Sequence, residues 1–413
     1  MGPTAERLPR AAWIAVAVGA VVRLVHWTTK FGDPLLLNDS WYYSGQAKQL
    51  VNGVWFRELL ADQPGAEHGP LTSLLMAPVS HGSHWQDWQR LVTVVTGCVT
   101  VWLLARLALA LAGPIVCTAA ASIAALYPNL WMNDGLVMSE SISMMLVALS
   151  LLLAHRAARE RDLRWMACTG LALGLGVLAR SELALLVPLV AAWLMLGERK
   201  PREHWRGALL AALVAGAVVV PWAAFNLARF ERPVLLTTND GTTWLGANCP
   251  ETYTGRTIGG WSVLCVAADP LYSPDEEPSV RSARQRGLAK EFVSQASLGD
   301  LAKVAAARVG RTLDLYGFEG LVSQDVGEER PRWAVWAGIA AFWFLAPLAA
   351  FGASKLDRWR RVLLLAPVAV VMVTTVLFYG AHRIRSSAEP SLVVLAAIGG
   401  VALWRRLRHT VSA

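Results

Sequence analysis

Residues 89–111 read QRLVTVVTGCVTVWLLARLALAL, and a second apolar run, residues 114–128 (PIVCTAAASIAALYP), follows two residues later. As an α-helix the first run would be about 34 Å long, while the hydrocarbon core of a bilayer is about 30 Å thick. Similar runs recur along the chain, so the sequence predicts about ten membrane-spanning helices. The predicted spans are 11–27, 89–111, 114–128, 136–154, 165–179, 183–197, 207–223, 333–352, 362–379 and 388–404.

The composition excludes an ordinary soluble protein. Of the 413 residues, 55% are hydrophobic and only 16% are charged, whereas soluble domains carry roughly 25% charged residues. The net charge is +8, a balance that also occurs in nucleic-acid-binding proteins. Here the basic residues cluster in short loops between apolar runs, so we interpret them as topology signals and expect no nucleic-acid partner.

Loop charge predicts the orientation in the membrane. Lys and Arg gather near the N-terminus, in 156–164, 199–206 and 355–361, and after residue 404, while the short alternate loops contain few. Because basic loops face the cytoplasm, we expect a multi-pass plasma-membrane protein with both termini cytoplasmic. Three parts follow: an N-terminal transmembrane module (1–223) with a first external loop (28–88), an extracytoplasmic domain (224–332) and C-terminal transmembrane helices (333–413).

The two long outward segments contain secondary structure of their own. Apolar residues at i, i+4, i+7 and i+8 (Tyr43, Ala47, Leu50 and Val51) predict an amphipathic helix from Ser40 to Asn52. Pro70–Val79 is apolar but too short to cross the bilayer, which indicates a re-entrant or interfacial helix. In the second segment we expect a strand at Val234–Thr238, a turn at 239–241, and helices near 279–296 and 298–316. The predicted fold class is therefore an all-α polytopic membrane protein with a small mixed α/β extracytoplasmic segment.

Two of the five cysteines, Cys249 and Cys265, lie in this outward segment. An extracytoplasmic setting is oxidising, so we predict a disulfide between them. In the chain-entropy model, closing a loop of this length stabilises the fold by roughly 3 kcal/mol.

Ionisable groups near the membrane are costly and are therefore functional candidates. The outward face carries six of them close to the ends of the spans: Asp39, His68, Glu140, Arg180, Arg383 and Arg385. A carboxylate such as Asp39 can serve as a general base, and arginines can bind a lipid phosphate bidentately. Trp244, Tyr42 and Tyr43 are candidates for contacts with a sugar or an acceptor.

Each of these residues also has an ordinary structural interpretation. Asp39 stands where a helix N-cap is expected, and His68 is a lone surface histidine. Arg180 has Glu182 and Glu140 available as ion-pair partners, and the arginines at 383 and 385 could be snorkelling anchors.

Motifs for other chemistries are missing from the sequence. It has no Walker A motif and no GxGxxG after a strand, which disfavours a nucleotide site, and no Cys/His cluster indicates a structural metal.

The order of these motifs is similar to that of a known superfamily. The stretch Asp39-Ser-Trp-Tyr-Tyr-x-x-x-Ala47-x-x-Leu50-x-x-Gly53, followed by His68-Gly-Pro, resembles the first external loop of GT-C fold glycosyltransferases. The groups it resembles most are the protein O-mannosyltransferases and the lipid A aminoarabinose transferases. Further matches in order are Tyr127-Pro, Ser-Glu140, Leu-Ala-Arg180-Ser-Glu182, Pro221-Trp-x-x-x-Asn226 and Arg383-x-Arg385-x-x-x-Glu389-Pro.

The resemblance implies a cell-envelope hexosyl- or pentosyltransferase. Such an enzyme takes a sugar from a polyprenyl-phosphate donor and passes it to a lipid, glycan or protein acceptor on the outer face. The catalytic base of the family falls on Asp39. Many members have Asp-Glu and His-Pro-Pro where this chain has Asp39-Ser and His68-Gly-Pro. Some need a divalent metal, but the matched acids here do not form a clear ligand set.

Three alternative functions fit the same features. A transporter or flippase of a lipid-linked sugar would also use many spans and buried charge, but polar residues here gather at the outer ends rather than at mid-membrane. A surface-polysaccharide polymerase or ligase would share the donor and transfer a larger glycan. A non-catalytic assembly protein would keep the fold without the chemistry.

Overall fold

The structure is a computed structural model, and it describes residues 7–36, 38–196, 201–271, 273 and 275–411. The ends of the predicted N- and C-terminal parts and residues 197–200 of one predicted basic loop lie outside this range. Ten apolar helices correspond in order to the ten predicted spans. They are α1 (Arg10–Thr28), α4 (Trp85–Ala112), α5 (Pro114–Leu126), α7 (Glu140–Glu160), α8 (Leu163–Ala179), α9 (Leu186–Leu196), α10 (Pro201–Leu227), α17 (Arg332–Lys355), α18 (Arg358–Leu377) and α20 (Glu389–Val411).

Within the described residues, seven helical segments are long and apolar enough to cross a membrane, and those containing α5, α8 and α9 are shorter. The membrane character of the fold is therefore confirmed, while the count of ten spans stays a prediction. Large apolar side chains on these helices point outward, among them Ile14, Leu213 and Phe344, which are 65%, 61% and 71% exposed. In a soluble protein such residues would be buried, so this surface suits a lipid environment.

In the described residues, ten further helices and four 3₁₀ turns connect these ten. The helices are α2 (Asp39–Val51), α3 (Leu71–Met76), α6 (Pro128–Trp131), α11 (Asn239–Ala247), α12 (Pro250–Tyr253), α13 (Val263–Ala267), α14 (Pro278–Gln295), α15 (Leu298–Thr312), α16 (Phe318–Gly327) and α19 (His382–Arg385). The 3₁₀ turns are Ala77–Val79, Ser181–Leu185, Gly255–Thr257 and Ser386–Ala388. The helices expected in the outward segments thus appear as α2, α14 and α15.

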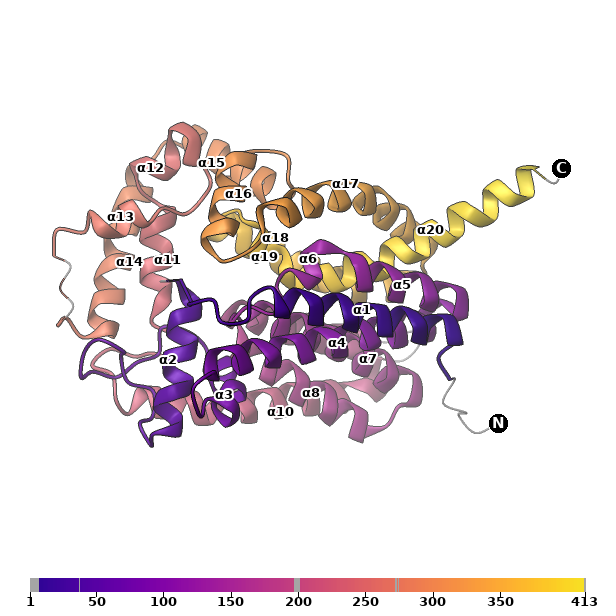
Figure 1. The fold of residues 1–413 in the computed structure, drawn as a ribbon, viewed down its shortest axis with the longest axis horizontal. Coiled ribbons are helices and arrows are strands. Elements are labelled where there is room, and N and C mark those ends of the chain that lie inside the picture. Colours follow the sequence, from indigo (N-terminus) through magenta and orange to yellow (C-terminus); the bar gives the residue numbers. More distant parts are fainter. Residues whose placement is uncertain (1–6, 37, 197–200, 272, 274, 412–413) are drawn as a thin grey trace.

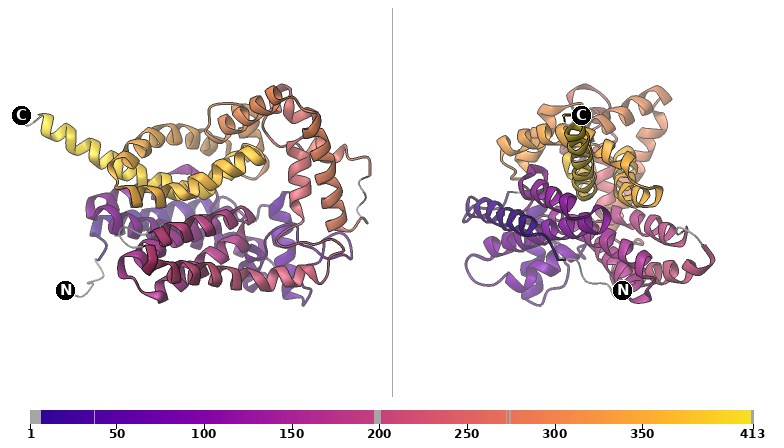
Figure 2. Two further views of the ribbon diagram at one scale, coloured as in Figure 1. Left: turned by 180° about the vertical axis from the view of Figure 1, so that it is seen from behind. Right: turned by 90° about the vertical axis from the view of Figure 1, so that its right-hand side faces the viewer.

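The long helices lie side by side along the long axis of the molecule (Figure 1), and α2, α11 and α14 stand across one end of them. Helix α1 begins and α20 ends at the opposite end, as the view from behind also shows (Figure 2). The start of α1 and the end of α20 therefore lie at the same end of the molecule, as an even number of spans requires.

Local sequence explains where the helices start and stop. Gly113, with φ at 85°, ends α4, and Pro114 opens α5, so two antiparallel helices need only one residue between them. Asp162 caps α8 by accepting from Arg164 N, and Asp357 caps α18 by accepting from Arg360 N. Both caps lie in basic loops predicted to face the cytoplasm.

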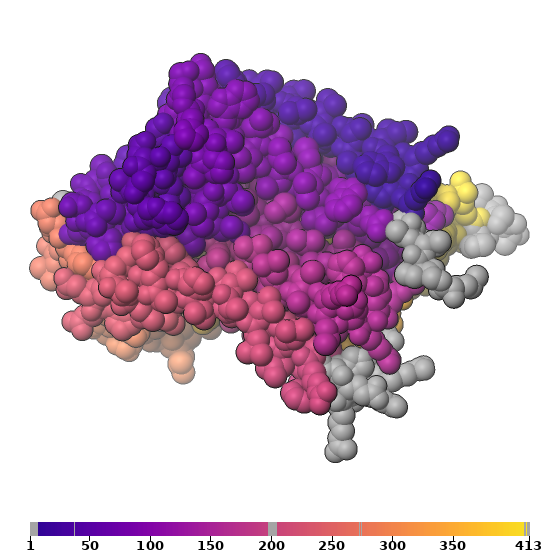
Figure 3. All heavy atoms as spheres, turned by 90° about the horizontal axis from the view of Figure 1, so that it is seen from below, coloured from indigo at the N-terminus to yellow at the C-terminus, as the bar shows by residue number. Residues whose placement is uncertain are grey.

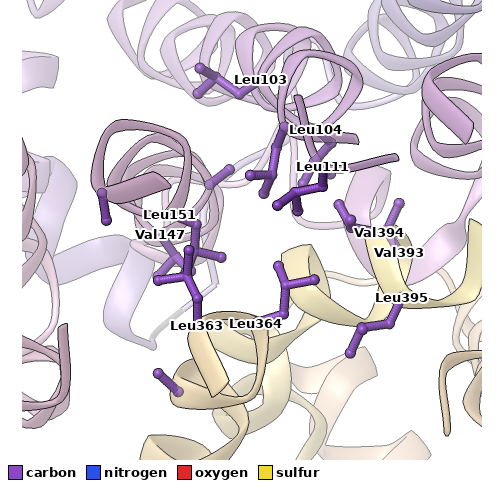
Figure 4. Packing of buried hydrophobic residues seen from close by; sticks show 14 of the residues in the cluster. Leu103, Leu104, Leu111, Val147, Leu151, Leu363, Leu364, Val393, Val394 and Leu395 are labelled. Atoms are coloured by element: carbon purple, nitrogen blue, oxygen red, sulfur yellow. The ribbon is translucent and has the colours of Figure 1, made fainter. Parts of the chain in front are cut away.

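The core lies between the N-terminal helices α4 and α7 and the C-terminal helices α18 and α20. Leu104 and Leu111 of α4 and Leu151 of α7 point toward Leu364 of α18 and Val394 of α20 (Figure 4). Because lipid tails are as apolar as leucine, such residues stabilise a membrane bundle through close van der Waals packing. The C-terminal helices are thus packed against the N-terminal module as one unit.

Small residues allow the closest helix contacts. Gly399 of α20 and Gly352 of α17 lie so close that a Cβ at either would collide with a backbone carbonyl oxygen of the other helix, that of Leu348 or Leu395. Close approach through small residues is the usual way in which membrane helices associate. The position of α20 along α17 is consequently fixed within narrow limits.

The predicted strand at Val234–Thr238 is wrong, and with it the mixed α/β character of the outward segment. The carbonyl oxygen of Leu236 accepts from Trp222 Nε1 at 2.7 Å and Asn226 Nδ2 at 3.4 Å, and Thr238 N donates to the Ala66 oxygen at 2.8 Å. These backbone groups are satisfied by α10 and the first external loop, so they form no strand ladder. Residues 239–241 likewise open α11 instead of forming a turn.

Across the described residues the only β-pairing is an isolated bridge between Arg57 and Pro64, so the fold is all-α. The first external loop packs directly on the segment after α10, where the purple and salmon surfaces meet in Figure 3. Arg229 fastens this contact by donating to the carbonyl oxygens of Phe56 and Gly65 while lying against the Phe225 ring.

The structure joins Cys249, at the start of α12, to Cys265 of α13, the pair predicted from the sequence. Their Cα atoms are 6.1 Å apart, within the range that a disulfide allows.

Candidate active site

Asp39 is the first residue of α2, but it does not cap the helix. Asn38 does, because its side-chain oxygen accepts from Ser40 N at 2.8 Å. The capping interpretation of Asp39 is therefore wrong, and its carboxylate, 25% exposed, is available for other contacts. Its Oδ2 accepts from Arg383 Nη2 at 2.5 Å, and its Oδ1 lies 3.5 Å from His68 Nε2.

Arg383 in the short helix α19 is the centre of the cluster. Besides Asp39 it binds Glu140 Oε1 through Nε at 3.2 Å and Glu328 Oε1 through Nη1 at 3.1 Å. The planar guanidinium, with five N–H donors in a fixed fork, suits this bridging position. One arginine of α19 thereby joins the start of α2, the start of α7 and Glu328 at the end of the predicted extracytoplasmic segment.

Glu140 opens α7 and is fully buried. Its Oε1 accepts from both Arg383 and Arg180, the latter at 2.9 Å, and its Oε2 has no hydrogen-bond partner among the described residues. Arg180 also donates to Glu182 at 2.5 Å. The two ion pairs considered as alternatives for Arg180 are therefore formed together.

Four further residues, which the sequence did not single out, form a chain of ion pairs that ends at Arg383. Glu328 also pairs with Arg330, which binds Asp325 at 3.2 Å, and Asp325 accepts from His382 Nδ1 at 2.6 Å. Glu328 and Arg330 stand directly before a predicted span on the outward face. That position, costly for charge, was the signal in the sequence that could have identified them.

Arg385 has a different environment from Arg383, although both were predicted to bind phosphate. It is 3% exposed, pairs with Asp314 at 2.8 Å and Glu389 at 2.7 Å, and lies 3.8 Å from the centre of the Phe342 ring. No contact with Asp39 or Glu140 is present in the described part of the chain. Arg385 thus fixes the start of α20 and is not available to a ligand.

The candidate sugar contacts divide in the same way. The His68 ring centre lies 4.9 Å from that of Tyr43 and 5.4 Å from that of Tyr42, so these three residues line one side of Asp39. Tyr42 also accepts a hydrogen bond from Glu67 N at 3.0 Å. Trp244 instead packs near Phe378 at the end of α18, and the described residues show no contact between it and the cluster.

Two opposing effects act on Asp39. Burial favours its neutral form, but the Arg383 guanidinium and the His68 imidazole outweigh burial and hold the pKa of Asp39 well below its usual value. For His68, burial favours the uncharged ring, yet Asp39 raises the pKa of the imidazole above its usual value. The resting site therefore contains an ionised Asp39 that is a weak base.

A second acidic pair lies next to His68. Burial raises the pKa of Glu67, and burial together with Glu67 raises the pKa of Glu58 to about 7. For these two carboxyls burial outweighs the nearby cations, whereas for Asp39 the cations outweigh burial, so the pKa values shift in opposite directions.

The donor set does not fit a divalent metal. Asp39, Glu140 and Glu328 all face one point, but the guanidinium of Arg383 occupies it. A search of the described residues finds no group of three His, Cys, Asp or Glu side chains placed to hold a metal ion. We therefore derive no step through a metal.

Comparison with known proteins supports a common architecture. The profile of the family described as dolichyl-phosphate-mannose-protein mannosyltransferase matches residues 67–225. The match includes His68, Glu140 and Arg180, but neither Asp39 nor Arg383. Comparison with curated protein sequences gave no match.

Among solved structures, this chain is similar to the oligosaccharyltransferase AglB of Archaeoglobus fulgidus in complex with an inhibitory peptide and a dolichol-phosphate. The TM-score is 0.58 at 14% identity, over 98% of this chain and 52% of that one. The same enzyme tethered to an acceptor peptide with an NVT sequon gives 0.59 at 12% identity, over 97% and 50%. ArnT from Cupriavidus metallidurans bound to undecaprenyl phosphate gives 0.44 at 15% identity, over 95% and 78%. This chain thus spans about half the length of AglB and shares its fold.

Proposed function

From the GT-C glycosyltransferase fold of this chain, we propose that it transfers a sugar from a polyprenyl-phosphate donor to an acceptor hydroxyl on the outer face of the plasma membrane. One observation carries the proposal: Asp39 of the first external loop lies against Arg383, at the end of the bundle opposite the outer ends of α1 and α20. A base and a phosphate-binding cation are the two groups that such a transfer needs. AglB, which shares the fold, was solved with a dolichol-phosphate, a lipid phosphate of the same class.

Donor binding begins at Arg383. In the described part of the chain its guanidinium pairs with three carboxylates, so an incoming phosphate must replace at least one of them. Asp39 is the partner that exchanges, because it is 25% exposed while Glu140 is fully buried and Glu328 is also held by Arg330. Arg180, joined to Glu140, adds a second cation beside the same position.

This exchange converts Asp39 from a weak base into a stronger one. The low pKa of Asp39 depends on Arg383, with His68 as the second cationic neighbour. Once the phosphate engages Arg383, burial remains and raises the pKa of the carboxyl toward that of an effective base. Binding of the donor thereby activates the residue that must deprotonate the acceptor.

The transfer step forms one bond to the sugar and breaks another. The acceptor O–H proton passes to Asp39 while the acceptor oxygen forms a bond to the anomeric carbon of the donor sugar. The bond from that carbon to the phosphate oxygen breaks, and the electron pair leaves with polyprenyl phosphate. Arg383 and Arg180 stabilise the negative charge that develops on the departing phosphate.

The direct test is release of polyprenyl phosphate. The purified protein is incubated with a panel of polyprenyl-phosphate hexoses and pentoses together with candidate lipid, glycan and peptide acceptors. Wild-type protein should release polyprenyl phosphate and label one acceptor. Movement of an intact lipid-linked sugar between leaflets of a proteoliposome, without release of polyprenyl phosphate, would show a transporter and refute the proposal.

A further inference from the structure

A separate cavity lies on the side of α2 that faces away from Asp39. Its volume is about 340 Å³, and it is lined by Trp41, Ser44, Gly45, Lys48, Gln49, Asn52, Leu59, Trp85 and Gln86. Residues 41, 44, 45, 48, 49 and 52 follow the helical repeat and share one face of α2. Tyr42, Tyr43 and Ala47, which are buried, belong to the other face, where His68 contacts both tyrosine rings. The cavity and the candidate active site are thus separated by the width of one helix, about 10 Å.

Two half-buried indole rings form part of the wall of this cavity. Trp41 comes from α2 and Trp85 from the first turn of α4. Lys48 is held in place between these helices, since its ammonium donates to the Ser80 oxygen at 3.1 Å and lies 5.5 Å from the centre of the Trp85 ring. A wall made from two fixed helices and a tethered lysine is largely preformed.

Carboxamides make up most of the polar part of the lining, beside Ser44 and Lys48. Gln49, Asn52 and Gln86 all contribute amide groups, and no carboxylate lines the cavity. The side-chain oxygen of Gln49 is buried and has no hydrogen-bond partner within the described range, while its nitrogen donates weakly to the Glu58 oxygen at 3.4 Å. An unsatisfied acceptor of this kind is costly and would gain from a hydroxyl donor.

We propose that this cavity binds a pyranose ring of the acceptor. A pyranose has apolar C–H faces, which suit indole rings, and a belt of hydroxyl groups, which suit carboxamides and an ammonium. An acyl chain would leave these amides without partners, so the lining favours a saccharide over a lipid tail. The assignment rests on the proposed function only in taking the sugar to be part of the acceptor.

The test measures binding without turnover. Saturation-transfer NMR is recorded on the protein in phosphatidylcholine nanodiscs with methyl α-mannoside, methyl β-galactoside and methyl N-acetyl-β-glucosaminide as probes. At least one probe should bind, and Trp41→Ala and Trp85→Ala should each weaken it about tenfold, as expected when stacking worth about 1.4 kcal/mol is lost. Gln86→Ala, at the half-buried start of α4, should also weaken binding while leaving the fold intact.

Two controls make the result specific. Trp55→Ala removes a 61% exposed indole from the same external loop but outside the cavity, and it should leave binding unchanged. Asp39→Asn should also bind the probe normally, because the cavity lies on the other side of α2.

The proposal is overturned if no probe binds, if Trp41→Ala and Trp85→Ala bind as well as wild type, or if Asp39→Asn abolishes binding. It is also overturned if phosphatidylglycerol, added to the nanodiscs, occupies the cavity and excludes every probe. Probe binding by a protein that releases no polyprenyl phosphate from any donor would refute the proposed function and leave the cavity as a saccharide site without an acceptor role.

Discussion

Replacing Asp39 by Asn should separate catalysis from structure. The substitution keeps the shape and removes the charge and the basicity of the side chain. Because Asn38 and not Asp39 caps α2, the change leaves the helix start untouched. Arg383 also keeps Glu140 at 3.2 Å and Glu328 at 3.1 Å as partners, so no guanidinium is left buried without an anion.

The two consequences differ in size. A hydrogen bond to a charged group contributes about 1.5–3 kcal/mol and a neutral one about 1 kcal/mol, so the free energy of unfolding should fall by about 1 kcal/mol. That corresponds to a loss of Tm below about 4 °C in a chain of this length. Loss of a general base costs about 10²–10⁴-fold in rate, or about 2.7–5.4 kcal/mol in the activation barrier. Turnover should therefore collapse in a protein that is nearly as stable as wild type.

Donor affinity supplies the decisive measurement. If phosphate and Asp39 compete for Arg383, removing the carboxylate should leave the Kd for polyprenyl phosphate unchanged or lower. The assay compares release of polyprenyl phosphate with its Kd, measured by thermophoresis, in wild type and Asp39→Asn at pH 7. At this pH the variant is not confounded by titration. The folded-state pKa of Asp39 lies below that of an unfolded aspartate, so its contribution to stability is lost only as the pH falls through the folded value.

Two outcomes would contradict this reasoning. Ordinary turnover by the folded variant would show that Asp39 is not the base, and Glu140 or Glu58 would become the candidates. A loss of donor affinity as large as the loss of turnover would show that Asp39 positions the donor.

Four further predictions concern other parts of the molecule. Arg383→Lys should weaken binding of polyprenyl phosphate by about 10–100-fold, because an ammonium cannot bind phosphate bidentately, and thermophoresis that shows unchanged affinity would exclude Arg383 as the phosphate ligand. Reducing the Cys249–Cys265 disulfide, or changing both cysteines to Ser, should lower the free energy of unfolding by roughly 3 kcal/mol, measured by denaturant titration, and unaltered stability would contradict the loop-closure argument. Glu58 has its pKa raised by burial to about 7, so the folded state holds a proton that the unfolded chain releases, stability falls as the pH rises from about 4.5 through 7, and Glu58→Gln should raise Tm more at pH 8 than at pH 5. In a variant without free cysteines, Asp275→Cys should react with an impermeant maleimide on intact cells, whereas labelling only after permeabilisation would reverse the predicted topology.

Apolar periodicity and length were enough to predict the membrane fold. Every predicted span has a corresponding helix, because a run such as residues 89–111 can satisfy its backbone in a bilayer only as a helix. The strand at Val234–Thr238 failed for a tertiary reason. Its β-branched residues favour a strand locally, but Trp222 and Asn226 take up the Leu236 carbonyl oxygen.

The candidate site was predicted in part. Asp39, Glu140, Arg180 and Arg383 meet in the structure, and charge near the ends of spans was the signal for all four. The roles of Arg383 and Arg385 could not be distinguished from the sequence. The two arginines lie two residues apart on one short helix, and only the tertiary fold determines that they have different partners. Glu328 and Arg330 carry the same signal, since they stand directly before a predicted span, but nothing local shows that this part of the chain folds back onto the first external loop.

The position of Arg383 late in the chain has a consequence for biosynthesis. Asp39, Glu140 and Glu328 are all synthesised and delivered to the membrane before the cation that joins them. At about 5–20 residues per second, the 344 residues from Asp39 to Arg383 take about 17–70 seconds to translate. Until Arg383 is translated, these carboxylates lie near the bilayer without their shared cation. A chain released before residue 383 would never gain that cation. Quality-control proteases and chaperones that detect unpaired charge beside a membrane would thus have a direct way to distinguish an unfinished copy from a complete one.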